Sequence, residues 1–153
     1  ARSQSNATDR SVDTSGTTLI ALQTKEEINS IRNRMQVYPT RLGIGSSGRA
    51  TVKLIKNPSS VSSTPSFSSA GSLSPIEYST STGVNTVSGG TVVATFFVGA
   101  GGVDIDLAPY FGYNKDYLSY PLTASEGDSL YVFAQSATGS VDMSAALTWE
   151  EQV

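Results

Sequence analysis

The chain has 153 residues, a formal net charge of −3, and neither Cys nor His. The missing Cys excludes a disulfide framework and thiolate zinc sites, and the missing His removes the commonest general base and the usual serine triad. Its 25 Ser, 16 Thr and 14 Gly indicate one sheet-rich domain with many turns, and no apolar run is long enough to predict a membrane span.

Residues 1–16 are predicted to form an extended arm. They contain a single large apolar residue, Val12, so by themselves they bury too little surface to offset the entropy of becoming ordered. We therefore expect a partner outside the domain to hold this arm, with Arg2, Arg10 and Val12 as contact residues. The folded domain is expected to span residues 17–153.

The first strand of this domain is predicted at 17–23, where TTLIALQ is a short β-branched and apolar run. Residues 24–38 fit either a capped helix or a turn followed by a long strand, and Pro39 favours the strand because it ends any helix. The apolar positions change from odd to even numbers between Val37 and Leu42, which predicts a β-bulge at the proline.

The middle of the chain is predicted to contain a hairpin and a long wrapped segment. The stretch GSSG at 45–48 lies between two alternating runs and predicts a hairpin loop, with the returning strand over 50–54. Residues 57–90 are rich in Ser, Pro, Gly and Thr. They predict short strands around 66–69 and 75–80 inside long loops that lie on the same domain.

The last part of the chain predicts four more strands. The nearly continuous apolar run TVVATFFV at 91–98 predicts a central strand, and the alternating run at 103–107 predicts an edge strand. SLYVFAQS at 129–136 and the strictly alternating run at 141–149 predict the last two. About eight or nine short strands without a helix predict an all-β fold, a single β-sandwich of jelly-roll type.

The string Gly127-Asp128-Ser129-Leu130 spells the name motif of a family of serine esterases. In that family the motif lies near the N-terminus and depends on a distant His, whereas this chain contains no His. A turn that leads into a strand accounts for the same residues. We therefore expect the chain to have no catalytic residues and no cofactor.

Two pairs of carboxylates are candidates for other chemistry. Asp104 and Asp106 project from one face of a predicted strand, where two oxygen ligands could hold calcium. No further oxygen ligand follows at a recognised spacing, so a solvated strand face is the expected role and no metal site is predicted. The same pair, or Glu126 with Asp128, could formally act as glycosidase carboxylates, but nothing in the sequence places them across a sugar-sized cleft.

Charge is divided unevenly along the chain. Residues 1–56 hold nine Lys and Arg against four Asp and Glu, and residues 57–153 hold one against nine. The basic part lacks the interleaved aromatic residues typical of nucleic-acid binding, whereas the division suits contacts between like subunits. The outward-facing arginines expected to make such contacts, with a solvated strand face as the alternative, are Arg32, Arg34, Arg41 and Arg49.

Aromatic residues are concentrated in the loop at 109–121, which holds Tyr110, Phe111, Tyr113 and Tyr117. Tyrosines in such a cluster favour protein interfaces and stacking on sugars, so these four are candidate partner-binding residues. The alternative is a small satellite core that covers one end of the sandwich.

The order of these segments resembles a known group of proteins. The segments are VYPTRLGIG, VKLIKNP, IEYSTS, VSGGTVV, EGDSLYVFAQS and VDMSAALTWEE. Between Thr17 and Glu151 this order is similar to small β-sandwich structural proteins of tailed bacteriophages, which occur as capsid decoration or cement proteins and as tail, baseplate or fibre components. The resemblance implies a virion protein without catalytic residues.

These observations lead to two functional hypotheses. The first is a capsid cement or decoration protein that binds the coat lattice on the outer surface of the virion and stabilises the shell. Its partners would be the major capsid protein and other copies of itself, with a trimer favoured, and neither nucleic acid nor membrane. The second is a tail, baseplate or fibre module whose loop at 109–121 recognises a host surface glycan.

Overall fold

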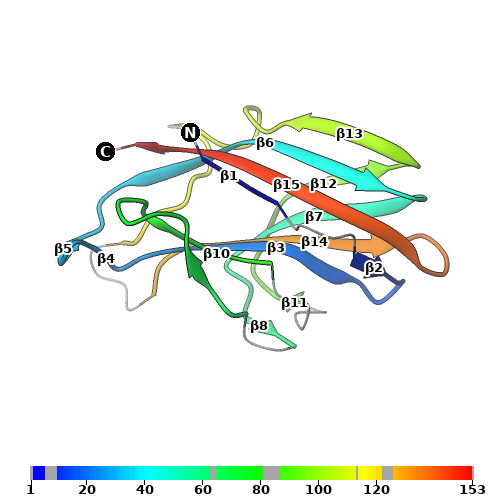
Figure 1. Ribbon diagram of the computed structural model, residues 1–153, viewed down its shortest axis with the longest axis horizontal. Helices are drawn as coiled ribbons and strands as arrows, with labels where there is room; N and C mark the ends of the chain where they lie inside the picture. Colours follow the sequence, from blue (N-terminus) through cyan, green and yellow to red (C-terminus); the bar gives the residue numbers. More distant parts are fainter. Residues whose placement is uncertain are drawn as a thin grey trace.

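The alternating residues of the chain form two antiparallel sheets that pack face to face as a β-sandwich (Figure 1). The structure is a computed structural model, and it describes residues 2–5, 10–62, 65–80, 87–112, 114–121 and 126–152. Over these residues it contains no helix, and so none of the length and apolar character needed to cross a membrane.

One sheet has five strands. They are β1 (Arg2–Ser5), β2 (Arg10–Val12), β15 (Val141–Gln152), β6 (Gln36–Ser46) and β13 (Gly101–Asp106). The other sheet has six strands, which in spatial order are β12 (Thr91–Val98), β7 (Ala50–Lys56), β14 (Ser129–Ser136), β3 (Thr17–Thr24), β10 (Ile76–Ser79) and β9 (Ser68–Ser69). Two short pairs lie outside these sheets: β4 (Glu27–Ile28) with β5 (Ile31–Arg32), and β8 (Ser60–Val61) with β11 (Val87–Ser88).

Four short connections at one end of the molecule join strands of one sheet to strands of the other. They lead from β2 to β3, from β6 to β7, from β12 to β13 and from β14 to β15, and all four lie at the same end of the molecule (Figure 1). In the five-stranded sheet β15 lies between β2 and β6, with β13 beyond them, and in the six-stranded sheet the order is β3, β14, β7 and β12. Each of these eight strands is therefore joined directly to the strand that occupies the matching place in the opposite sheet.

This arrangement corrects the predicted hairpin at 45–48. The segment does turn the chain between two alternating strands, but β6 and β7 belong to different sheets and do not pair. Leu42 and Ile44 of β6 face Val52 and Leu54 of β7 across one core. A run of alternating residues shows which side chains are buried but not whether the next strand pairs beside it or packs opposite it.

Other predicted strand features are confirmed. Relative to β15, the register of β6 shifts by one residue between Pro39 and Arg41, which is the bulge expected at the proline. The alternation of β15 is also confirmed, with Trp149 fully buried. The long strand begins only at Gln36. Residues 27–32 before it form a short hairpin with a two-residue turn, in which Asn29 and Ser30 both have positive φ.

The predicted N-terminal arm is corrected in part. Its described residues are extended, but they pair with β15 of the same domain, β1 opposite residues 146–149 and β2 opposite residues 141–143. Val12 is fully buried in the main core. A composition argument counts side-chain surface, whereas a strand added to a sheet edge is held mainly by backbone hydrogen bonds that need no apolar residue. No outside partner is required to order these residues.

A cavity in the main core should destabilise the domain strongly. We expect Leu42→Ala, at a fully buried position, to lower the free energy of unfolding by about 2–5 kcal/mol, because it removes apolar contacts and leaves a void. Leu73→Ala is the matched control, since that side chain is 62% exposed and its loss should cost less than about 0.5 kcal/mol. Urea unfolding followed by tryptophan fluorescence measures both, and equal effects would contradict the assignment of the core.

Candidate assembly surface

One side of the sandwich ends in two strands that each have a neighbour on one side only. β12 pairs with β7, and β13 pairs with β6, and no described strand lies beyond either of them. We call this side, residues 91–106, the open edge. A strand at an edge has unpaired N–H and C=O groups along its outer side, so the open edge can accept another strand.

The open edge also exposes apolar side chains. Over the described residues five large hydrophobic side chains are exposed. Three of them, Phe97, Val92 and Val103, belong to the open edge, and Phe97 is 85% exposed. Burying a side chain of this size would contribute about 2 kcal/mol, so the open edge is a candidate surface for association.

The local structure explains these positions. The register of β12 against β7 shifts between Val92 and Ala94, a β-bulge that turns Val92 to the outer face. Ala94 and Val98 face the main core, whereas Phe97 lies on the outer face of the six-stranded sheet. Val103 pairs with the buried Ile44, so it faces the core from a strand with no further neighbour to cover it.

The predicted central position of residues 91–98 is therefore wrong. The run is nearly continuous in apolar residues because its inner residues fill the core and its outer residues remain exposed. A central strand produces the same pattern when both of its faces are covered. The predicted edge strand at 103–107 is confirmed as β13. Sequence reasoning missed Phe97 and Val92, and the uncharged apolar run itself was the signal that could have identified them.

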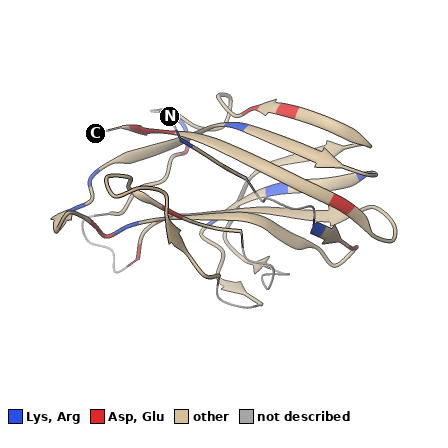
Figure 2. Cartoon of the chain, viewed as in Figure 1, with Lys and Arg blue, Asp and Glu red and all other residues tan. Residues whose placement is uncertain are grey.

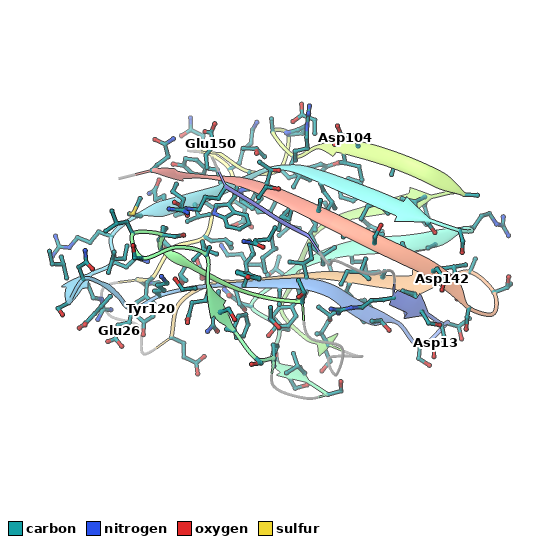
Figure 3. The ribbon with its side chains drawn as sticks, in the orientation of Figure 1. Asp13, Glu26, Asp104, Tyr120, Asp142 and Glu150 are labelled. Carbon is teal, nitrogen blue, oxygen red and sulfur yellow. The ribbon has the colours of Figure 1, made fainter. Side chains whose placement is uncertain are left out.

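The charged side chains of the open edge itself are the two aspartates of β13, and Lys53 of the neighbouring β7 lies opposite Thr95. β12 contains no charged residue. On β13, Asp104 projects outward (Figure 3) and lies 3.5 Å from the guanidinium of Arg41. The carboxylate of Asp106 accepts a hydrogen bond from the backbone N–H of Ala108 at 3.0 Å. Over the described residues no group of three or more acidic, His or Cys side chains could hold a metal ion.

Arg2 and Arg10, expected to contact a partner, are held within the domain. Arg2 donates to Glu151 at 2.9 Å and to the backbone oxygen of Ala70 at 3.2 Å. Arg10 is 8% exposed and donates to the backbone oxygen of Thr18 at 2.9 Å, and burial lowers the pKa of its guanidinium. Together with the buried Val12, these residues attach the N-terminal segment to its own sandwich.

Glu151 is the acceptor at the centre of this attachment. Burial by itself raises the pKa of Glu151, but hydrogen bonds from Ser74, Trp149 and Arg2, together with the charge of Arg2, outweigh it and hold the pKa below its ordinary value of 4.5. The bond from Trp149 Nε1 measures 3.1 Å. One carboxylate thus connects β1, β15 and the segment before β10.

The remaining arginines lie at separate places. The Arg32 guanidinium lies 4.7 Å from the centre of the Tyr120 ring and donates to the backbone oxygen of Pro121 at 2.8 Å. Arg34 is exposed beside the β4–β5 hairpin, and Arg49 is exposed in the connection from β6 to β7. Of the four predicted outward arginines, Arg41 lies on the strand that pairs with β13 and forms an ion pair with Asp104 of the open edge.

The aromatic loop at 109–121 packs mainly against the sandwich. Phe111 is 4% exposed and belongs to the main core, which corrects its assignment as a partner-binding residue. Tyr110 packs edge-to-face on Phe96 at 5.6 Å, and Tyr117 packs on Tyr38 at 6.2 Å. Tyr113 lies outside the described residues. The described part of the loop therefore packs as part of the main core, and does not form the separate satellite core that the sequence left as the alternative.

The basic and acidic parts of the sequence form ion pairs with each other within the chain. Arg2 with Glu151, Arg41 with Asp104, and Lys56 with both Asp116 and Asp128 each join a cation from residues 1–56 to an anion from residues 57–153. Figure 2 shows both signs mixed over the two sheets. Folding interleaves the two parts of the chain, so among the residues that the structure describes the division produces no large basic or acidic face for a neighbouring subunit.

The esterase-like string at 127–130 has a structural role. The Asp128 carboxylate accepts hydrogen bonds from the backbone N–H of Ser119 at 3.0 Å and from the Asn57 side chain at 2.9 Å, and it lies 3.7 Å from Lys56 Nζ. A Cβ at Gly127 would collide with Thr24 and Tyr120, so the turn requires glycine. Asp128 therefore joins the turn before β14 to the end of β7.

No protein-family model and no curated protein matches the chain.

Glu151 should control part of the stability in acid. Its folded pKa lies below the unfolded value of 4.5, so its contribution is fully present above that value and is lost as the pH falls through the folded pKa. We expect Glu151→Gln to lower the free energy of unfolding at neutral pH by about 1.5–3 kcal/mol and to flatten its acid dependence. The exposed neighbour Glu150 (Figure 3) provides the control Glu150→Gln, which should behave like the unsubstituted chain in urea unfolding at stepped pH.

Substitutions at Asp128 and Ser129 distinguish a structural role of residues 127–130 from a catalytic one. We expect Asp128→Ala to lower the free energy of unfolding by about 1–3 kcal/mol, because it removes the acceptor of two hydrogen bonds, and Ser129→Ala to change it by less than about 0.5 kcal/mol. Asp142→Ala is the control at an exposed aspartate of β15 (Figure 3). An ester hydrolysis activity in the purified chain that Ser129→Ala abolishes would contradict the structural role.

Proposed function

We propose that the chain is a non-enzymatic structural protein of a tailed-bacteriophage particle, a capsid cement or decoration protein located on the outer surface of the shell. The observation that carries this proposal is the open edge, where Phe97 is 85% exposed on an uncharged eight-residue strand. Such an edge on a single chain favours aggregation unless another molecule covers it, and a protein that works in an assembly has that cover.

The strand order supports the same proposal. We infer that eight strands form a jelly roll, namely β2, β3, β6, β7, β12, β13, β14 and β15. Each of the four connections described above joins two of these strands that occupy matching places in the two sheets. Jelly rolls are frequent in viral capsid proteins and in lectins. This argument is one of fold analogy and supports a class of function, not a site.

The proposed mechanism is the burial of interfaces. The sandwich would contact the major capsid protein and further copies of itself, and would stabilise the shell through the surface covered at its edges. The sequence favours a trimer for the contacts between copies, and the two-fold contact argued below from the open edge replaces it. The described residues 2–5 and 10–12 lie on their own sheet, so the proposed contacts do not include an arm that extends from these residues to a partner. Neither nucleic acid nor membrane is a proposed partner.

The alternative is recognition of a host surface glycan by a tail or fibre module. It requires aromatic rings at 109–121 that are free to stack on a sugar. Of the described residues of that loop, Phe111 is buried, Tyr110 packs on Phe96 and Tyr117 packs on Tyr38. These contacts favour assembly over glycan binding.

Purified particles test the proposal. A cement or decoration protein should occur in virus particles from the source of this sequence at a copy number comparable with that of the coat protein, because it occupies repeated sites of the shell. Quantitative mass spectrometry of density-purified particles measures this ratio, with portal and tail-tip proteins as low-copy references. Absence from particles would contradict the proposal, and a copy number equal to the low-copy references would support the tail alternative.

A further inference from the structure

We infer that the open edge binds the same edge of a second copy of this chain around a two-fold axis, so that the six-stranded sheet continues from β12 of one copy into β12 of the other. The inference rests on the proposed function only in treating the chain as an assembly subunit. It names the partner of the open edge and the symmetry of the contact.

The backbone of β12 is suited to this contact. The strand has eight residues, is paired only with β7, and contains neither a charged residue nor a proline. Natural edge strands usually avoid pairing through lysine, proline or very short length. β12 has none of these protections. Its β-bulge lies between Val92 and Ala94, near the start of the strand, and pairing is regular from Ala94 to Val98, so a second antiparallel strand can form hydrogen bonds along the outer side of these residues.

The choice of a second copy follows from the other side of the sandwich. There the six-stranded sheet ends in β9, which has two residues, and the five-stranded sheet ends in β1, where Arg2 reaches over to Ala70. The described chain therefore has one long open edge. An edge that can meet only its own equivalent forms an isologous contact, which closes as a dimer instead of growing into a ring or a filament.

The side chains at the edge are compatible with such symmetry. An isologous contact brings groups near the axis close to their own copies, so an uncompensated charge there would be unfavourable. β12 has no charge, and Asp104 of β13 is paired with Arg41. Phe97 and Val92 lie on the same outer face near opposite ends of β12. An antiparallel partner therefore places the phenylalanine of one copy toward the valine of the other.

The area of the open edge is also large enough for a stable contact between two copies. Eight residues at about 3.4 Å each make β12 roughly 27 Å long, and two sheets about 10 Å apart make the edge roughly 20 Å deep once side chains are included. This band, on the order of 500 Å² in projection, is comparable with the roughly 800 Å² of accessible surface that each partner contributes to a stable interface. Accessible area exceeds projected area, which brings the two values closer.

Sedimentation velocity over a concentration series tests the contact. We expect the unsubstituted chain to form a dimer. Phe97→Lys should raise the dissociation constant of this dimer at least about tenfold. Since Phe97 is 85% exposed, this variant should keep the circular dichroism spectrum and the urea midpoint of the parent. Leu73→Lys, at a position 62% exposed but away from the open edge, is the matched control and should dimerise like the parent.

Cysteine cross-linking tests the symmetry, because the natural chain has no Cys. Thr95 is exposed near the middle of β12, so Thr95→Cys should place two thiols close to the axis and give a covalent dimer on mild oxidation. Ser140→Cys, exposed in the connection from β14 to β15, should remain monomeric on a denaturing gel.

A monomer at all concentrations, a trimer without dimer, a dimer unaffected by Phe97→Lys, or equal cross-linking of both cysteine variants would overturn the inference. These results differ from a failure of the proposed function. A monomer found at high copy number in particles would leave that function standing, and a dimer absent from particles would contradict the function but not the contact.

Discussion

The structure depends on burial of one core between two sheets whose strands are joined across it. At one end of the molecule four connections lead from a strand of one sheet to the matching strand of the other, so the two layers cannot slide apart without unfolding (Figure 1). The alternation of β6, β7 and β15 places every second side chain in this core, with Trp149 fully buried. Burial of apolar side chains drives this packing. Because the core is close-packed, side chains on the outer faces of the strands have no place in it and stay on the surface.

The periphery is then held by polar contacts between distant parts of the chain. Glu151 joins β1 to the segment before β10, and Asp128 joins the turn before β14 to Asn57 and Lys56. Each is a carboxylate with several donors at the rim of the core, where charge-assisted hydrogen bonds are stronger than on an open surface. Four acidic residues from the second part of the chain thereby form ion pairs with cations of the first part.

The two sides of the sandwich are finished differently, and this difference leads to the functional proposal. On one side short strands and the N-terminal segment cover the sheets, whereas on the other side β12 and β13 end without cover and expose Phe97, Val92 and Val103. No pair of side chains in the described residues suggests catalysis as directly as this edge suggests association. The physical asymmetry of the fold, more than any motif, supports a structural subunit.

The sequence by itself determined the all-β class, the positions of most strands, the bulge at Pro39 and the buried face of β15, because these follow from local periodicity and backbone restrictions. The tertiary structure alone decided that β6 and β7 face each other, that residues 2–5 and 10–12 join the sheet of their own domain, and that Phe111 is buried while Phe97 is exposed. Alternation specifies which face of a strand is apolar but not its neighbours. Whether an apolar face is core or surface depends on those neighbours, which long-range packing selects.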